Sequence, residues 1–435
     1  MSMSRVAEST APLSEAEVQR LRADFPILAQ EVNGHPLAYL DSGATSQRPL
    51  AVLDAERAFA STTNSAVHRG AHTLAAEATE LFEDARATVA RFVGADEDEI
   101  VWTSNATEAI NLVAYSLSNA SLGRGGAAAE GLRLREGDEI VTTEMEHHAN
   151  LIPWQELAAR TGATLKVVPL DDAGALRLDV AAELITERTK LVAFTHVSNV
   201  LGVINPVEQL VTLARRVGAL VLLDACQSAP HLPLDVKALD VDFAVLSGHK
   251  MLGPTGIGAL YGRRELLEAM PPFLTGGSMI TTVTTTEAEY LPPPQRFEAG
   301  TQRVSQAIAL AAAVDYLTAV GMPRIAAHEA AFGRRLVEGL SAIDGVRVLG
   351  AGIDLPRVGL ASFDVAGIHS HDVGQYLDDL GIAVRVGHHC AQPLHRRLGV
   401  TSSTRASTYL YTTDAEVEAV IAGVAGAIDF FRRGA

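Results

Sequence analysis

Apolar residues follow two different periods in the first half of the chain. From Leu74 to Phe92 they recur at helical spacing, and Gly94 stands just beyond as a helix stop. Short runs that are almost entirely apolar come next, most of them separated by segments of helical pattern, at 99–103, 139–143, 164–170, 190–197, 219–225 and 242–248. Strands that are apolar on both faces are typical of a mainly parallel sheet with helices on both sides. The pattern therefore predicts an α/β fold.

The pattern changes towards the second half of the chain. The stretch LPPPQRFEAGTQ (291–302) has the proline and glycine content of a passage between domains. Beyond it, helical patterns accompany two predicted strands, at 358–365 and 381–387. We expect three parts: an N-terminal segment, 1–32, that packs on the rest, a large domain over 33–300, and a smaller α/β C-terminal domain over 301–435.

Polar residues follow most of the predicted strands directly. In a mainly parallel sheet the carboxyl ends of the strands lie along one edge, and ligands bind there. The segments at that edge read SNATEAIN (104–111), EMEHHAN (144–150), SNVLG (198–202), CQS (226–228) and HK (249–250). We expect them to form one site.

Composition narrows the class of protein. The chain has 435 residues, of which 48% are hydrophobic and 20% charged, and this is typical of a soluble globular protein with more than one core. Its net charge of -17 argues against a nucleic acid or an anionic membrane as partner. No apolar run of signal-peptide or membrane-spanning length is present, so we expect a cytoplasmic protein. The two cysteines, Cys226 and Cys390, form neither a disulfide framework nor a metal-type spacing.

Lys250 and Asp224 stand at the ends of two predicted strands. Lys250 lies in SGHKMLGPTGIG (247–258), and a lysine fixed at a strand end beside flexible glycines suits a Schiff base with a cofactor. A solvated surface lysine is the alternative. An unpaired carboxylate is costly where Asp224 leaves its apolar strand, so a protonated pyridine nitrogen would suit it, although a helix cap is also possible. Gln227 could bond the phenolic oxygen of such a ring.

A phosphate site is predicted where SNATEAIN opens a helix. Ala106 offers a backbone amide and Thr107 an amide and a hydroxyl at the positive end of that helix. Ser247 and His249, which flank the end of the lysine's strand, can add donors to the same phosphate.

Two adjacent histidines follow another strand, in EMEHHANLIPW. Neighbouring rings cannot easily bind a single metal ion, so we predict no metal site here. An imidazole stacked on a flat cofactor is the better interpretation, with His147 preferred and His148 second.

Together these segments resemble the pyridoxal 5'-phosphate (PLP) enzymes of aminotransferase class V, and most closely the SufS-type (group II) cysteine desulfurases. The resemblance covers nearly the whole chain, from FPIL (25–28) through YLDSGATSQRP and VHRGAHTL to RVGHHCAQPLHRRLGVTSSTRAS. It implies a fold-type I homodimer that binds PLP and acts on L-cysteine, with its active site at the dimer interface.

The resemblance also implies roles for individual residues. Lys250 is the Schiff-base lysine, Asp224 pairs with the pyridine nitrogen, Gln227 meets the phenolic oxygen, and His147 stacks on the ring. The phosphate is held by Thr107, Ser247 and His249, together with Ala106. Asn199 lies near the ring oxygen and the substrate, Arg405 grips the substrate carboxylate, and Arg385 is a further substrate-binding residue.

Four residues match positions at the site shared between subunits in this family: Gly300, Thr301, His68 and Arg69. Thr301 is expected to reach the neighbouring subunit's phosphate, and His68 to contribute to substrate binding. The usual family pattern has proline where Gln302 stands, which puts the conformation of that turn in question.

Cys390 decides the expected reaction. It follows a predicted strand on a loop with Gly387, Arg385 and two histidines, surroundings that favour a thiolate. The alternative, a buried cysteine acting as a small hydrophobe, suits Cys226 better. The resemblance implies that Cys390 accepts sulfur as a persulfide and passes it to an acceptor protein of the SufE or SufU kind for iron–sulfur cluster assembly.

Other interpretations stay open. Selenocysteine lyase uses the same scaffold, and a class V aminotransferase is possible although transamination needs no nucleophilic thiol. A non-catalytic scaffold is disfavoured because Lys250, Asp224 and Cys390 occur together. His369 and His371 are either solvated residues or contacts for a metal carried by the acceptor protein. The stretch 123–138 is predicted to be a surface insertion and is assigned no role.

Overall fold

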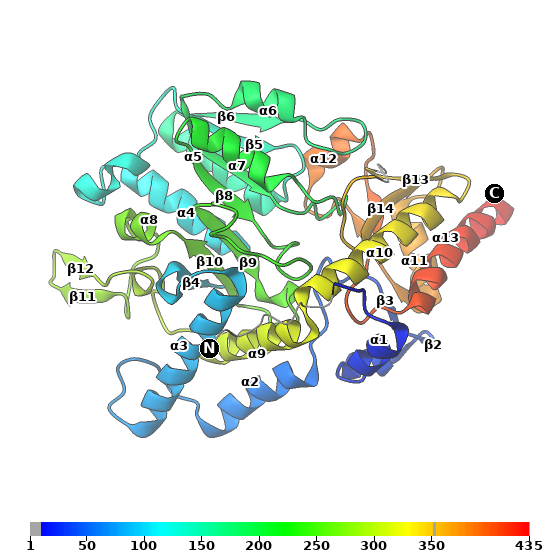
Figure 1. Cartoon of the computed structure of the whole chain (residues 1–435), viewed down its shortest axis with the longest axis horizontal. Coiled ribbons are helices and arrows are strands. Elements are labelled where there is room, and N and C mark those ends of the chain that lie inside the picture. The colour runs from blue at the N-terminus through cyan, green and yellow to red at the C-terminus, as the bar shows by residue number, and fades with distance from the viewer. Residues whose placement is uncertain (1–9, 351–353, 435) are drawn as a thin grey trace, which may run out of the picture.

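The computed structural model describes residues 10–350 and 354–434. Its largest element is a seven-stranded sheet in the order β4-β10-β9-β8-β7-β5-β6 (Figure 1). All strands run parallel except β10, which is antiparallel to both of its neighbours. In that order the strands are Ile100–Thr103, Gly258–Gly262, Phe243–Ser247, Leu220–Asp224, Thr189–Thr195, Glu139–Thr143 and Thr164–Val168. Six of them coincide with predicted runs, and β10 was not predicted.

Helices cover both faces of this sheet, as expected. Alternate residues of β8 belong to different cores, because Val221 and Leu223 face one cluster and Leu222 faces the other. Helix α3 ends at Gly94, whose φ of 74° is the left-handed conformation of a helix C-cap. One face is covered by α2 (Leu50–Thr62), α3 (Thr73–Val93), α6 (Leu178–Leu184), α7 (Val207–Arg216) and α9 (Val304–Val320), the other by α4 (Ala106–Ser121), α5 (Ile152–Thr161) and α8 (Arg264–Ala269).

A second, antiparallel sheet forms the smaller α/β unit, in the order β13-β14-β17-β16. The predicted strand at 381–387 divides into β15 (Ile382–Ala383) and β16 (Arg385–Gly387). The other strands are β13 (Val346–Val348), β14 (Leu360–Val365) and β17 (Ser403–Ser407), and the helices are α10 (Met322–Ser341), α11 (Ser370–Asp379), α12 (Gln392–Arg397) and α13 (Asp414–Gly434). Helices α10, α11 and α13 share one apolar core with this sheet.

Two segments cross the expected domain boundaries. β3 (Ala38–Tyr39) pairs in parallel with β15, and the Leu40 carbonyl accepts from the Ser407 amide. In the other direction, α9 packs into the core of the large sheet. The domain boundary at residue 300 stays a prediction. In the structure, β3 lies before that boundary and pairs with the smaller unit, whereas α9 lies after it and packs in the larger unit.

The N-terminal segment contacts both units. Arg22 of α1 (Glu15–Arg22) donates to the Tyr411 carbonyl at 2.7 Å, and Phe25 packs against Tyr316 and Tyr411. Residues 1–9 of the expected 1–32 segment lie outside the described residues. Two small hairpins complete the strands: β1 (Glu31–Val32) with β2 (His35–Pro36), and β11 (Ile280–Val283) with β12 (Ala288–Tyr290).

The predicted insertion at 123–138 contains a 3-10 helix, Gly126–Leu132, whose Ala129 and Leu132 are buried in the core beside α4. Over residues 10–350 and 354–434, no single helix has the length and apolarity to cross a membrane. Helices α9 and α10 have the required length and apolarity only when they are taken together, and a 78° bend separates them.

Candidate active site

A cavity of about 580 Å³ lies between the two units. The carboxyl ends of β4, β5, β7, β8 and β9 supply one wall, and residues of the smaller unit supply the other. Most of the predicted site residues line it: Ala106, Thr107, His147, Asn199, Asp224, Gln227, Ser247, His249, Lys250, Arg385, Cys390 and Arg405. Residues at or beyond the ends of the predicted strands thus lie together in one cavity. Their individual roles stay predictions.

Lys250 is held by the turn that follows β9. The carbonyl of His249, directly before it, accepts from the Ser46 amide at 2.9 Å and from the Thr45 hydroxyl at 3.1 Å. Burial, together with the neighbouring Lys250 charge, lowers the pKa of His249 to about 4. His249 is therefore neutral at physiological pH and can donate through one ring nitrogen.

Asp224 is the last residue of β8, and Gln227 lies in the segment that follows it. Asp224 is 5% exposed, and its Oδ1 accepts from the Cys226 amide at 3.0 Å. The Gln227 side chain donates to the Gly43 carbonyl at 2.7 Å, which leaves its Oε1 buried without a hydrogen-bond partner among the described residues. Both side chains thus present acceptor oxygens in a buried setting, where a ligand that donates is favoured.

The amino end of α4 forms another part of the cavity. Asn105 caps the helix by accepting from the Glu108 amide at 3.0 Å, and the Ala106 amide donates to the Ser247 hydroxyl at 2.9 Å. A helix amino terminus carries a partial positive charge and attracts anions. This end of the cavity is suited to a phosphate.

His147 and His148 have different positions. His147 lines the cavity, and its Nδ1 accepts from the Ala149 amide at 3.1 Å, so the proton of the neutral ring is on Nε2. Burial, followed by the charge of Lys250, lowers its pKa to about 4. His148 instead holds the turn of Cys390, because its amide donates to the Cys390 carbonyl at 2.7 Å and its ring accepts from the Gln392 amide at 3.1 Å.

Arg405 stands on the opposite wall and is 2% exposed. It donates to the Asn199 carbonyl at 2.9 Å and forms an ion pair with Asp41 at 3.2 Å, and burial lowers its pKa. Arg385 approaches the other oxygen of Asp41 at 3.8 Å. Two guanidinium groups beside one carboxylate leave a net positive site for a substrate carboxylate.

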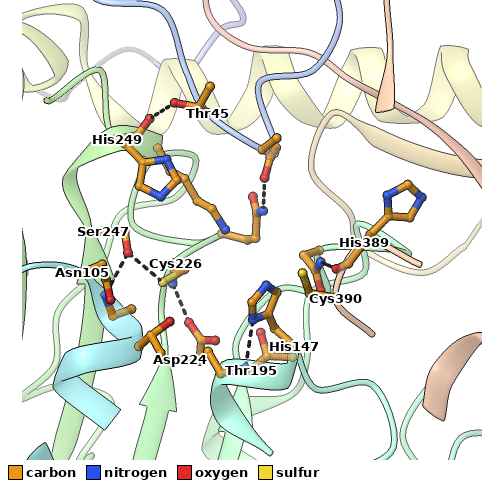
Figure 2. Close-up of a pocket in the computed structure, with 18 of the residues that line it drawn as sticks. Thr45, Asn105, His147, Thr195, Asp224, Cys226, Ser247, His249, His389 and Cys390 are labelled. Atoms are coloured by element: carbon orange, nitrogen blue, oxygen red, sulfur yellow. Dashed lines mark hydrogen bonds between the residues drawn. The ribbon is translucent and has the colours of Figure 1, made fainter. Parts of the chain in front are cut away.

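The two cysteines have opposite surroundings. Cys390 is exposed, on the turn between β16 and α12, and Figure 2 shows it with His147 on the side of the cavity away from Ser247 and Asn105. Cys226 is buried beside Asp224, 3.7 Å from the Ser247 hydroxyl, and burial and Asp224 raise the pKa of its thiol. Cys390 is the one of the two that a reagent or partner can reach.

The comparisons with known proteins agree with this geometry. The model of the family "Aminotransferase class-V" matches residues 38–420. The chain belongs to the aminotransferase class V family. "Probable cysteine desulfurase 2" of Mycobacterium leprae is 56% identical to this chain over 98% of the chain and 100% of the relative.

Two solved structures extend the comparison. The apo structure of a cysteine desulfurase from Thermococcus onnurineus NA1 has a TM-score of 0.88 and 39% identity, and the match covers 97% of this chain and 100% of that one. A mutant of the cystine C-S lyase C-DES, with glycine covalently linked to its PLP cofactor, has a TM-score of 0.77 and 26% identity, over 93% of this chain and 98% of that one. The predicted fold-type I architecture is confirmed, and the chain is a PLP-dependent enzyme of this family.

The donors and acceptors of the cavity fit PLP. That cofactor presents an aldehyde, a ring nitrogen and a phosphate to its protein. Lys250 offers an amine to the aldehyde, the buried Asp224 carboxylate suits a protonated ring nitrogen, and the amino end of α4 suits the phosphate. The unpartnered Gln227 Oε1 lies in the same cavity and can accept from a hydroxyl on the ring.

The residues expected at a site shared between subunits do not line this cavity. Thr301 lines a separate pocket with Phe297 and Glu108. The His68 ring bonds to Glu83 at 2.8 Å, and the Arg69 guanidinium donates to the Ile280 carbonyl at 3.4 Å. Their expected roles toward a neighbouring subunit stay predictions.

Some residues of the cavity were not anticipated: Asp41, Thr195, Thr255 and His389. Asp41 and Thr195 lie in or beside strands, where polar residues gave no separate signal. The sequence indicates His389 only as one of the two histidines beside Cys390. Within the described ranges, no group of three or more His, Cys, Asp or Glu side chains could hold a metal ion.

Proposed function

We propose that this enzyme is a group II (SufS-type) cysteine desulfurase that converts L-cysteine to L-alanine and collects the sulfur on Cys390 as a persulfide. The observation that supports this most is the exposed Cys390 in the cavity that Lys250 and two arginines also line. A transaminase has no need of a nucleophilic thiol at that position. The similarity to curated cysteine desulfurases supports the same activity.

Different residues of the chain have different roles in this reaction. When bound, PLP supplies an electron-withdrawing ring that makes the Cα proton of the amino acid removable. Arg405 holds the substrate carboxylate, Lys250 takes the proton from Cα, and Asp224 keeps the proton on the ring nitrogen. His147, neutral at physiological pH, lies in the cavity without adding a positive charge beside Lys250.

Cys390 carries out the sulfur step. Its thiolate attacks the sulfur of the substrate, so that a sulfur–sulfur bond forms while the bond from Cβ to sulfur breaks and leaves its electron pair on the carbon side. Protonation of Cβ, together with return of a proton to Cα from Lys250, gives alanine. The sulfur stays on Cys390, from which an acceptor thiolate can take it in a second exchange.

The test compares wild type with Cys390→Ala in the presence of a reductant. Wild type should be yellow and release alanine and sulfide in equal amounts from L-cysteine. The variant should stay yellow and lose sulfur release by about a hundredfold or more, because it lacks the nucleophile. Equal activity of the two proteins would refute the role of Cys390, and a keto acid product in place of alanine would indicate an aminotransferase. Turnover of selenocysteine in parallel separates a selenocysteine lyase from a desulfurase.

The proposal includes a cytoplasmic homodimer with a shared site, a SufE-like or SufU-like acceptor, and a role in iron–sulfur cluster assembly. Thr301, His68 and Arg69 lie outside the cavity of their own chain, as residues that serve a neighbouring subunit would. His369 and His371 are exposed, with stacked rings 5.4 Å apart, at the start of α11. If either meets a metal on the acceptor, His371→Ala should lower acceptor-dependent turnover and leave turnover with a small reductant unchanged.

A further inference from the structure

A chain of hydrogen bonds encloses the turn that carries Cys390. The Nε2 atoms of His389 and His395 each lie 2.9 Å from the same oxygen, the Oγ of Ser403. The other ring nitrogen of His395, Nδ1, lies 3.0 Å from the Ala391 carbonyl. His389 and Ala391 flank Cys390 in the sequence. The hydrogen bonds therefore connect the residue before the cysteine, through Ser403 and His395, to the residue after it.

The protons along this chain have a single arrangement when both rings are neutral. A carbonyl only accepts, so His395 carries its proton on Nδ1 and its Nε2 is an acceptor. The Ser403 hydroxyl must therefore donate to His395, and its oxygen accepts from Nε2 of His389. His389 is left with a bare Nδ1, and that atom is buried without a hydrogen-bond partner among the described residues.

Burial keeps both rings neutral. Ser403 is fully buried, His395 is 1% exposed and His389 is 5% exposed. Burial, followed by the charges of Arg405, His395 and Arg385, lowers the pKa of His389 to about 2. Burial is also the main cause that lowers the pKa of His395, opposed by its bond to Ala391 and aided by His388.

The turn needs such support because its backbone is unusual. His389 and Cys390 have φ values of 49° and 56°, a left-handed conformation that residues with a Cβ seldom adopt. Two further hydrogen bonds hold the main chain here, both 2.7 Å long. The side-chain Nδ2 of Asn199 donates to the His389 carbonyl, and the backbone amide of His148 donates to the Cys390 carbonyl. These bonds fix carbonyls, whereas the His389 side chain is held by Ser403.

We propose that Ser403 and His395 are positioning residues for Cys390: a serine hydroxyl between two neutral imidazoles holds the 388–391 turn in the conformation that presents the thiolate in the cavity lined by Arg385 and Arg405. The inference rests on the proposed function for the role of Cys390 as nucleophile. Ser403 lies two residues before Arg405 on β17, and Gly387 pairs with it across the sheet, so one strand fixes both the turn and the substrate arginine.

A matched pair of variants tests this. Threonine and valine have the same shape at position 403, but only threonine keeps the hydroxyl. In the PLP-loaded protein, the rate of alkylation of Cys390 by iodoacetamide should stay within about twofold of wild type in Ser403→Thr and fall about tenfold in Ser403→Val, because the valine leaves the His389 donor and the His395 acceptor buried and unpaired. The modified peptide is identified by mass spectrometry, which separates Cys390 from Cys226. The kcat for L-cysteine should fall in parallel while KM stays within about twofold.

His395 should behave as part of the same unit. His395→Met should slow alkylation about as much as Ser403→Val, and the double variant should lose little more, because both changes break one chain. Ser402→Ala is the control, since the Ser402 hydroxyl bonds to Ser370 at 2.8 Å and to neither histidine. It should match wild type.

The outcomes distinguish a positioning role from simple packing, and a failure of this inference from a failure of the proposed function. If Ser403→Thr and Ser403→Val lose alkylation equally, the site only packs and the inference is wrong. If both variants have a melting temperature well below that of wild type, Ser403→Ala, which adds no bulk, replaces them. An alkylation rate equal to that of wild type in Ser403→Ala would refute the inference, and a slow rate would support it. If alkylation separates the pair but wild type releases no alanine or sulfide from L-cysteine, the proposed function fails and the positioning role stands.

Discussion

At the scale of single residues, Cys226 and Cys390 line one cavity in opposite environments. Burial and the Asp224 carboxylate raise the pKa of the Cys226 thiol, whereas Cys390 is exposed on a turn beside two arginines. A thiol reacts as its thiolate, so these surroundings support the proposed role of Cys390 and favour packing as the role of Cys226.

Cys226→Ala should therefore keep the rate of alanine release from L-cysteine within about twofold of wild type, because a buried neutral thiol behaves as a small apolar group. The measurement is alanine formation, with the visible spectrum of the cofactor as a check on binding. A tenfold loss with the cofactor fully bound would show that Cys226 takes part in the reaction.

Arg405→Lys tests the proposed substrate-binding role of Arg405. The guanidinium bonds to Asn199 and Asp41 at once, and an ammonium group cannot reproduce that fork. KM for L-cysteine should rise about tenfold or more with a smaller change in kcat, measured by initial rates across substrate concentration. Arg396→Lys, on the neighbouring helix α12 and outside the cavity, is the control and should leave KM unchanged.

The sequence predicted residues that stand at the ends of apolar strands and missed residues whose importance depends on contacts formed only in the folded chain. Lys250, Asp224 and His147 lie at or just beyond the ends of apolar strands, so the edge of the sheet could be inferred from the pattern. Asp41 and Ser403 gave no such signal, because one pairs with arginines more than 340 positions away and the other joins two histidines.

At the scale of elements, the antiparallel strand β10 fixes the amino end of α4. A Cβ on Gly258 would lie 2.8 Å from the Asn105 Cα and 2.6 Å from the Leu246 carbonyl oxygen. Both are backbone atoms that cannot easily move, so only glycine allows the strand to lie this close to the predicted phosphate site.

Gly258→Ala should thus displace the first turn of α4. We expect a loss of about 1–3 kcal/mol in the free energy of unfolding and about tenfold weaker PLP binding. Equilibrium titration of the apo protein with PLP, followed by absorbance, measures the second effect. Gly256→Ala is an informative comparison, because a Cβ there meets open space although its φ of 80° adds strain; a larger loss of affinity in that variant would contradict the expected role of close approach.

Strand prediction succeeded where burial made a run apolar and failed where it did not. β10 reads GALYG, too short and too rich in glycine to stand out, and β17 reads STRAS, which is polar although all five of its residues are buried. The Ser403 and Arg405 side chains of β17 bond to the turn and to the cavity instead of filling an apolar core, so the hydropathy of this strand resembles that of a loop.

At the scale of the whole molecule, a buried pair links the two units. His231, beyond β8, has its Nδ1 3.6 Å from Oε2 of Glu329 on α10, and both residues are almost fully buried. Burial raises the pKa of Glu329 to about 8 and lowers that of His231 to about 3, so both are neutral at moderate pH. Glu329 Oε1 and His231 Nδ1 have no hydrogen-bond partner among the described residues.

This pair predicts a pH dependence of stability. Because the folded pKa of Glu329 is raised above its unfolded value, its contribution is complete below about pH 4.5 and is lost as the pH rises toward 8. Glu329→Gln cannot ionise, and its amide can donate to His231, so the variant should be more stable than wild type at pH 8 by about 1–2 kcal/mol and similar at pH 5.

Urea unfolding at the two pH values measures the difference. Glu338→Gln, exposed on the same helix, should leave the pH dependence of wild type unchanged. A Glu329→Gln variant that is less stable than wild type at pH 8 would show that the carboxylate is ionised and needed there.

The pairing of β3 with β15 has a consequence for dividing the molecule. Residues 38–42 bond to the small unit through Gly381, Ala383 and Ser407, while Ser46, only four residues further on, holds the carbonyl of His249 beside Lys250. A gene fragment beginning at codon 301 would therefore encode β15 without its partner, and one ending at codon 300 would encode β3 without its partner. For fragment complementation or circular permutation, new ends belong in the exposed tip of the β11–β12 hairpin, because a cut there leaves both sheets intact.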